Sequence, residues 1–160
     1  GASQLGILRG SLSNTKKKQI TSVLNTALPI VSWQRNIELI QWQKLAVNCV
    51  INPLTALNKV CNGELARPEF QIQIAVIIRE VISTASVVNV ALLFDDLYSL
   101  VATVIDKTAT NKSSMLQDVL NNRRTEIDYI NGFVHKTALK HNIATPENTK
   151  LWQQVRLLEN

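Results

Sequence analysis

Cysteine is scarce in this 160-residue sequence, which has only Cys49 and Cys61. Two residues are too few for a disulfide framework or a structural zinc site, so we expect free thiols in a reducing compartment and no metal. Long apolar runs are also missing, and none approaches the roughly 20 residues of a membrane span. The charged start of a signal peptide is absent as well. These absences favour a soluble, cytoplasmic protein that does not bind membranes.

Aromatic residues make up 5% of the sequence and charged residues 18%, whereas hydrophobic residues make up 46%. The net charge is +5, with basic clusters only at residues 16–18 and 123–124. A nucleic-acid-binding protein usually has a longer basic stripe, often with aromatic residues between the basic ones. Nucleic acid is therefore not an expected partner. The modest positive balance suits small anionic ligands such as a carboxylate and a phosphorylated cofactor.

The five glycines do not form the G-x-G-x-x-G turn that receives a pyrophosphate at a helix N-terminus. The sequence therefore lacks a dinucleotide-binding turn. Residues 4–9 alternate weakly and predict a lone edge strand, frayed or paired with another molecule.

Elsewhere, apolar residues recur at helical spacing and predict one all-α domain of about seven helices. The first helix has Ile20, Val23, Leu24 and Ala27 on one face. The expected helices run from about 15 to Pro29, 36 to 52, 68 to 90, 95 to 105, from 114, from 126 to 140, and from 145. Asn52-Pro53 should end or kink the second of these. Asn62-Gly63 predicts a turn.

Lys44, Asn48 and Asn52 stand at i, i+4 and i+8 among apolar residues, so a helix places all three on one face. An ammonium group with two carboxamides in a cleft can bind a small oxygen-rich anion and donate a proton to a carbonyl. The alternatives remain open at this point. Lys44 can be an ordinary surface lysine, and Asn52 can cap a short new helix that has Pro53 at its first position.

Three separated segments resemble the C-terminal domain of the ketopantoate reductase family (2-dehydropantoate 2-reductases). Residues 44–56 read KLAVNCVINPLTA and are followed by NGEL at 62–65, which is similar to the family's K-L-x-x-N-x-x-I-N-P-L-T-A and N-G-E-L. Residues 113–133 (SSMLQDVLNNRRTEIDYINGF) and 141–152 (HNIATPENTKLW) resemble two further family segments. The three segments occur in the family's order, and the resemblance runs from about Leu5 to the C-terminus.

The resemblance implies a helical domain like the C-terminal domain of 6-phosphogluconate dehydrogenase, in an enzyme that reduces ketopantoate with NADPH. It implies that Lys44 is the general acid and that Glu126 lies where cofactor and substrate meet, as a catalytic and cofactor-binding residue. Four further residues are then expected to hold the substrate: Asn48, Asn52, Asn62 and Ser114. A lysine suits this chemistry, because carbonyl reduction builds negative charge on oxygen.

Simpler roles exist for the residues of the second segment. Ser114 and Thr125 each begin a capping-box pattern, and Glu126 in a first helical turn would offset the helix dipole. Arg123-Arg124 could meet a cofactor phosphate, although a solvated loop is favoured. His135 and His141 are expected to be solvated. Capping and function can coexist at one residue.

The resembled enzymes bind NADPH mainly through an N-terminal Rossmann domain, which this sequence lacks. We therefore expect residues 1–160 to be the substrate-binding half, with residues 1–12 as a remnant of the inter-domain edge and no activity in isolation. A vector-derived start at residues 1–3 is an alternative. The expected partners are a 2-oxo acid, the Rossmann domain and, through the apolar surface left uncovered, a second copy of the chain. The rival hypothesis is a non-enzymatic helical module for dimerisation or partner binding.

Overall fold

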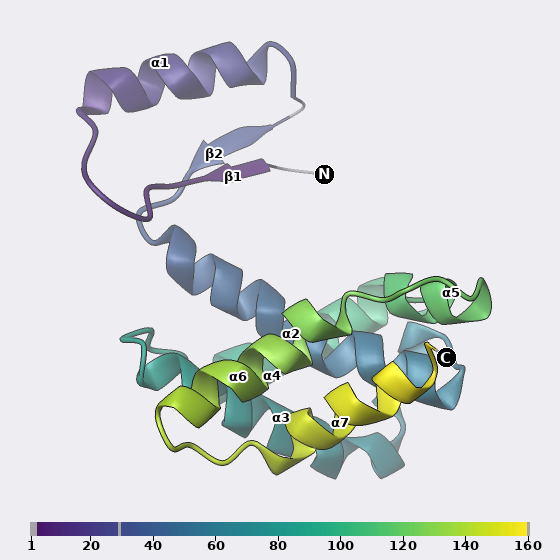
Figure 1. Cartoon of the computed structure of the whole chain (residues 1–160). Coiled ribbons are helices and arrows are strands. Elements are labelled where there is room, and N and C mark those ends of the chain that lie inside the picture. The colour runs from purple at the N-terminus through teal and green to yellow at the C-terminus, as the bar shows by residue number, and fades with distance from the viewer. Residues whose placement is uncertain (1–2, 29, 160) are drawn as a thin grey trace. The chain divides into compact units, whose positions relative to one another are not determined.

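The computed structural model describes residues 3–28 and 30–159, so Gly1, Ala2 and the predicted helix stop at Pro29 lie outside the described residues. The chain divides into two compact units, Gly1–Gln41 and Trp42–Asn160. The all-α prediction is confirmed, because the described residues form seven α-helices and only two three-residue strands (Figure 1). None of these helices is long and apolar enough to cross a membrane.

The first unit is a small β–α–β arrangement. Strand β1 (Ser3–Leu5) pairs in parallel with β2 (Val31–Trp33), and helix α1 (Asn14–Asn25) connects them. The prediction of a lone strand is therefore wrong. A three-residue strand has too little alternation to be recognised in the sequence. The α1 helix is also shorter than expected and has no buried residue, so its predicted apolar face is not covered within this unit.

Helix α2 (Ile37–Asn58) contains Pro53 in its interior and continues past it. Of the two expected outcomes, an end or a kink, the helix therefore does not end at Asn52-Pro53, and the alternative that Asn52 caps a new helix is excluded. A proline has no N–H, so the carbonyl of Cys49, four residues earlier, loses its helical partner. The Nδ2 of Asn131 donates a hydrogen bond to this carbonyl at 3.0 Å. A buried side chain from another helix thus replaces the missing backbone donor.

The remaining elements follow the predicted order with shifted boundaries. They are η1 (Asn62–Ala66), α3 (Pro68–Ser86), α4 (Phe94–Lys107), α5 (Ser114–Leu120), η2 (Ile127–Tyr129), α6 (Asn131–Lys140) and α7 (Pro146–Leu157). Asp95 and Asp96 do lie in the first turn of α4, and Pro146 does begin α7. The helix predicted from 126 to 140 is instead a short 3-10 turn and α6, because Ile130 leaves the helical region with ψ of −97°.

A buried polar network joins α2, α6, α7 and α3 in the second unit. Besides the Cys49 carbonyl, Asn131 donates to Oδ1 of Asn148 at 2.9 Å. Asn148 in turn donates to Glu80 at 2.7 Å, and the Glu80 carboxylate accepts the backbone N–H groups of Glu147 and Asn148 at 2.8 Å each. Glu80 therefore caps the N-terminus of α7 from α3, and the capping is favourable because a carboxylate there meets the positive end of the helix dipole.

We expect Asn131→Ala to destabilise the chain by about 1–3 kcal/mol, because it leaves the buried carbonyl of Cys49 without a donor. In a Pro53→Ala background a backbone N–H at position 53 can serve that carbonyl, so the loss should shrink by about 1 kcal/mol. Urea unfolding of the four chains of this cycle measures the coupling.

Asn121→Ala is the control, since Asn121 is exposed at the end of α5. It should change the free energy of unfolding by no more than about 0.5 kcal/mol. Strictly additive effects of Asn131→Ala and Pro53→Ala would contradict the proposed compensation.

Candidate functional site

The polar stripe of α2 runs from solvent into the fold. Lys44 is exposed, Asn48 is half-buried and Asn52 is buried. Helical spacing places the three on one face, with the ammonium group at the wet end and the carboxamides deeper. Such a stripe can hold a carboxylate near Lys44 and a second polar group of the same small molecule near the amides. The exposure of Lys44 also fits an ordinary surface lysine, so its role stays a prediction.

Cys49 lies beside Asn48 but is fully buried, and burial raises the pKa of its thiol far above the ordinary range. A protonated thiol is a poor nucleophile and a poor metal ligand. Both cysteines are free, as predicted. Within residues 3–28 and 30–159, no group of three or more His, Cys, Asp or Glu side chains is placed to hold a metal ion.

A hydrogen bond joins the turn after Asn52 to the start of α5. The Oγ1 of Thr55 and the Oγ of Ser113 lie 2.6 Å apart, and both residues are buried. Ser113 also accepts the N–H of Leu116 at 3.0 Å and so is the N-cap of α5. The prediction that Ser114 caps this helix is therefore wrong. Ser113, which is also hydrogen-bonded to Thr55, occupies the N-cap position. Ser114 is the first helical residue and is exposed.

Asn62 is buried and joins η1 to the loop after α4. Its N–H donates to the carbonyl of Asn111 at 2.9 Å, and its Nδ2 donates to Oγ1 of Thr108 at 2.9 Å. The predicted Asn-Gly turn is the start of η1. A Cβ atom on Gly63 would lie 2.7 Å from the Cβ of Ala109, so the close approach requires glycine. The Oδ1 of Asn62 is buried and has no hydrogen-bond partner among the described residues.

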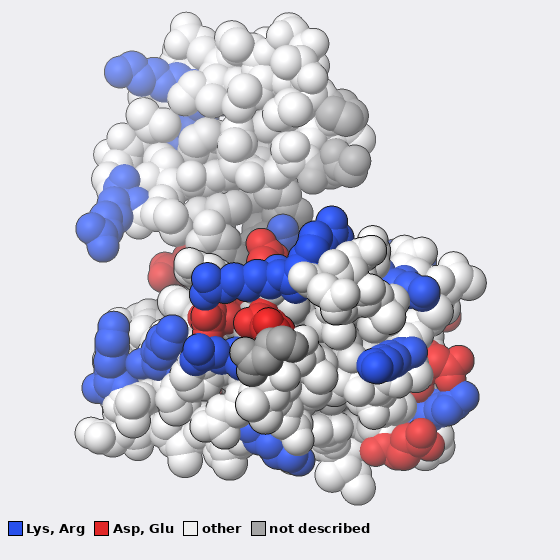
Figure 2. All heavy atoms as spheres, turned by 45° about the vertical axis from the view of Figure 1, so that its right-hand side comes forward, with Lys and Arg blue, Asp and Glu red and all other residues white. Residues whose placement is uncertain are grey.

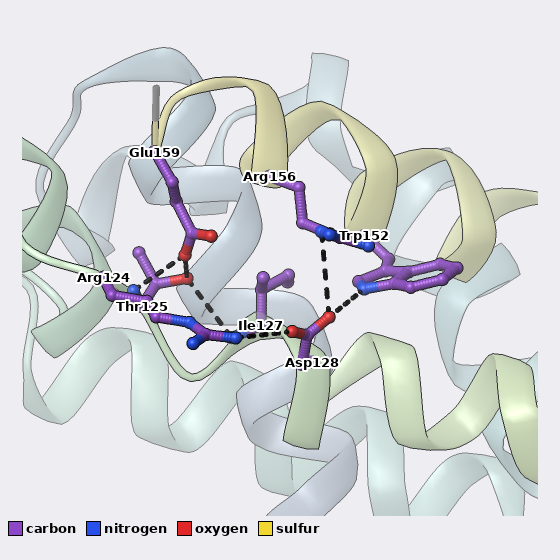
Figure 3. Close-up of polar contacts among 7 residues, drawn as sticks. All are labelled: Arg124, Thr125, Ile127, Asp128, Trp152, Arg156 and Glu159. Carbon is purple, nitrogen blue, oxygen red and sulfur yellow. Dashed lines mark hydrogen bonds and ion pairs between the residues drawn. The ribbon is translucent and has the colours of Figure 1, made fainter.

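Glu126 is exposed immediately before η2, whereas its neighbours Thr125 and Ile127 are buried. The capping box predicted for Thr125 and Asp128 is wrong. Thr125 Oγ1 accepts the N–H of Ile127 at 3.2 Å, and Asp128 Oδ1 accepts the indole N–H of Trp152 at 2.7 Å (Figure 3). The Asp128 carboxylate binds the indole of Trp152 on α7 instead of the backbone N–H of Thr125 that a capping box would require.

Two contacts place the η2–α6 segment beside the helix that carries the polar stripe. The rings of Trp42 and Phe133 lie 5.8 Å apart, two residues before Lys44 and seven after Glu126. The Cys49–Asn131 hydrogen bond lies one residue after Asn48. Thr55–Ser113 adds a third connection, to the segment of Ser114. The segments that carry Ser114 and Glu126 are thus joined to α2, the helix that carries Lys44, Asn48 and Asn52.

The cavity of about 260 Å³ between η1, α3 and α4 contains none of the predicted site residues. Its walls are mainly apolar, and the hydroxyl of Tyr98 already donates to Gln71 at 2.6 Å. Because Tyr98 and Gln71 bind each other, Asp106 is the charged side chain left in the lining, and the cavity offers little else to orient a polar substrate. We therefore place the candidate site along α2 rather than in this cavity.

Sequence reasoning missed Thr55, Ser113 and Glu80. Glu80 did give a signal, since a lone carboxylate in an Ile- and Val-rich helix must find buried donors. For the two serines the sequence favoured the wrong one, because Gln117 completes a capping-box pattern with Ser114. The prediction for His135 is also wrong, since this half-buried ring stacks on Trp152 at 5.0 Å and lies 2.8 Å from Oγ1 of Thr149.

Exposed side chains agree with the prediction for His141 and the solvated-loop interpretation of Arg123 and Arg124. The two arginines pair with Asp118 and Asp128 at 3.0 Å and 3.4 Å. The hydrogen bond from Trp152 lowers the pKa of Asp128 most strongly. Desolvation raises this pKa, but the charge of Arg156 and the hydrogen bond from Arg124 lower it further, so the net shift is downward.

Asp128 should make stability depend on acid pH. Its pKa is lower in the folded state than in the unfolded chain, where aspartate titrates near about 3.9. Its stabilisation is therefore present above that pH and lost as the pH falls through the folded pKa. Urea unfolding at pH 7 and about pH 3 should show a larger loss for the unsubstituted chain than for Asp128→Asn.

Asp106→Asn removes an exposed carboxylate from α4 and is the control, which should follow the unsubstituted chain. An equal acid-induced loss with and without the Asp128 carboxylate would contradict this assignment.

Known proteins are similar to this chain along most of its length. Residues 36–159 match the family described as "Ketopantoate reductase PanE/ApbA C terminal". The 2-dehydropantoate 2-reductase of Escherichia coli O157:H7 is 48% identical over 147 residues, which cover 88% of this chain and 46% of that protein. The chain thus spans about half the length of the curated relatives it matches.

Two solved structures are similar as well. The ternary structure of D-mandelate dehydrogenase with NADH and anilino(oxo)acetate matches with a TM-score of 0.90 and 26% identity, over 98% of this chain and 65% of that one. A PanE/ApbA family ketopantoate reductase from Ralstonia eutropha JMP134 matches with a TM-score of 0.86 and 26% identity, over 99% of this chain and 52% of that one. With the motifs and the helical fold, these matches establish that the chain belongs to the ketopantoate reductase family, of which it carries the C-terminal domain.

Proposed function

We propose that this chain is the substrate-binding and proton-donating half of an NADPH-dependent reductase that converts 2-dehydropantoate to pantoate in pantothenate biosynthesis. The observation that carries the proposal is the stripe of Lys44, Asn48 and Asn52 on one helix of this family's domain. The name of the Escherichia coli relative supports the substrate. The NADH complex of D-mandelate dehydrogenase supports a nicotinamide cofactor.

In the proposed chemistry, the reacting carbonyl lies near Lys44, at the solvent-exposed end of the polar stripe. Bound NADPH supplies the hydride. Negative charge then builds on the carbonyl oxygen, where the Lys44 ammonium stabilises it and donates a proton. Asn48 and Asn52 hold the substrate along α2, with Ser114 at the adjoining start of α5. The buried Oδ1 of Asn62, which has no partner within the described part of the chain, can accept a hydrogen bond from a donor that reaches it.

Glu126 supplies the carboxylate where cofactor and substrate meet. Its side chain is exposed while the residues on both sides are buried, so the carboxylate projects from a held turn. An exposed carboxylate suits a hydroxyl donor such as a ribose or a substrate hydroxyl. These features fit the edge of a nicotinamide site.

The first unit supports a Rossmann domain as the partner. Two parallel strands joined by a helix are the repeating element of α/β sheets, which normally have helices on both faces. Here the pair is only two strands wide, and the side chains of Leu8, Val23 and Ile30 are more than half exposed. The first unit also carries few charged side chains on the face drawn in Figure 2. We infer that further strands and helices of the enzyme cover this surface.

The 160-residue chain alone should give no turnover with ketopantoate and little or no heat on calorimetric titration with NADPH, because its phosphate-binding turn would lie in the partner domain. A chimera that joins this chain to the N-terminal half of the Escherichia coli relative should bind NADPH and reduce ketopantoate. Micromolar NADPH binding by the isolated chain, or a folded chimera without turnover, would contradict the proposal.

Lys44→Met in this chimera should lower kcat by about 10²- to 10⁴-fold, equivalent to about 3–5 kcal/mol of barrier. Methionine keeps the helix and much of the aliphatic stem but removes the charge and the proton. The KM for ketopantoate should rise, whereas NADPH affinity should barely change. Steady-state kinetics measures both effects, and circular dichroism checks folding.

Lys107→Met is the matched control, since Lys107 is an exposed lysine in the last turn of α4. It should keep the kinetics of the unsubstituted chimera. A folded Lys44→Met chimera that retains more than about a third of kcat would exclude Lys44 as the proton donor, and the exposed lysine would then be an ordinary surface residue.

A further inference from the structure

We propose that Glu159, just beyond the end of α7, is a positioning residue that holds the Glu126 turn in its working geometry. The inference rests on the proposed function, in which Glu126 acts where cofactor and substrate meet. It adds a role for a residue that touches neither, and it assigns to α7 the support of the site.

The first observation is the pair of hydrogen bonds that Glu159 receives from Thr125. One oxygen, Oε1, accepts the Thr125 backbone N–H at 2.7 Å and its hydroxyl at 2.6 Å. The Thr125 hydroxyl oxygen also accepts the N–H of Ile127 at 3.2 Å. The carboxylate therefore fixes the residue before Glu126 directly and the residue after it through one hydroxyl. Figure 3 shows this arrangement.

The second observation is that α7 also holds Asp128, the residue three positions after Thr125. The indole of Trp152 donates to Asp128 at 2.7 Å, and Nε of Arg156 lies 4.0 Å from the same carboxylate. Trp152 is itself held by stacking on His135. Trp152 and Arg156 of α7, together with Glu159 just beyond its end, therefore point toward the Glu126 turn (Figure 3).

The residues on both sides of Glu126 are buried. Ile127 is 1% exposed and Thr125 is 7% exposed, so the turn is held by packing as well as by hydrogen bonds. Glu126 stands between them with its side chain in solvent. A functional group held by its supporting residues loses little freedom when a ligand binds, and a displacement of about 1 Å can cost about 10²-fold in rate. Among the residues that the structure describes, Glu159 is the one carboxylate outside this turn that accepts hydrogen bonds from it.

The test uses the active chimera and compares Glu159→Ala with Glu159→Gln. The alanine variant removes the acceptor, so we expect a loss in kcat/KM for NADPH of about tenfold or more. The glutamine variant keeps a side-chain oxygen that can accept from Thr125, so it should recover most of that loss. In a Glu126→Ala background, Glu159→Ala should have no further effect on kcat/KM, because the group that it positions is gone.

Val155→Ala is the matched stability control, because Val155 is fully buried on α7 and takes no part in the hydrogen bonds between Thr125 and Glu159. It should lower Tm and leave the KM for NADPH unchanged. In the 160-residue chain, Glu159→Ala should speed amide hydrogen exchange at Thr125 and Ile127 more than Val155→Ala does.

The outcomes separate the two hypotheses. If Glu126→Ala leaves the kinetics of the chimera unchanged, the proposed role of Glu126 is wrong. If Glu126→Ala impairs the chimera but Glu159→Ala is silent, or its effect is fully additive with that of Glu126→Ala, the positioning role of Glu159 is wrong. Equal losses of kcat/KM in Glu159→Ala and Val155→Ala would also overturn the inference, since lost stability alone would then account for both.

Discussion

The hydrogen bond from Asn131 to the carbonyl of Cys49 is the constraint on which the second unit depends. Pro53 leaves that carbonyl without a helical donor, and its position in the interior would otherwise cost several kcal/mol. One side-chain amide both satisfies it and reaches Asn148, which binds Glu80. Four helices therefore meet through three buried polar side chains. Because unpaired buried polar groups are costly, few other arrangements of these helices would pair as many of these groups.

The same buried network also holds α2, the helix that carries most of the candidate site. Asn48 and Asn52 lie on either side of Cys49 along α2. The part of α2 that would hold a substrate is therefore the part to which Asn131 supplies the missing hydrogen-bond donor. Thr55 then ties the next turn to Ser113. The candidate residues Lys44, Ser114 and Glu126 are exposed and need not maintain the fold, because separate, buried residues do so. Asn62 differs, since it also holds η1 through its hydrogen bonds to Asn111 and Thr108. Substitutions at the two sets should consequently differ in whether they change stability or kinetics.

The sequence predicted most helices but not the contacts between them. Periodicity located α3, α4 and α7, since their apolar faces are long and buried. It failed at β2, where three residues carry no period. It also failed at Pro53, where the missing donor for the Cys49 carbonyl comes from Asn131, 82 positions after Cys49. Ser114 and Asp128 failed for a related reason: each local capping pattern lost to a partner from another element, Thr55 for Ser113 and Trp152 for Asp128. The candidate site residues came from motif resemblance, whereas Glu159 was invisible because nothing near it in sequence marks its partner.

The position of Asn131 in the chain has a consequence for the order of folding. During synthesis α2 emerges long before α6, so the carbonyl of Cys49 must wait for its donor in water or in an incomplete helix. Pairing over 82 residues carries a loop-closure cost that only the assembled second unit can repay. The amino-terminal half of α2 is free to form early, whereas the region around Pro53 can become rigid only after most of the domain has been made. The part of α2 around Pro53 is thus among the last parts of its own domain to be completed.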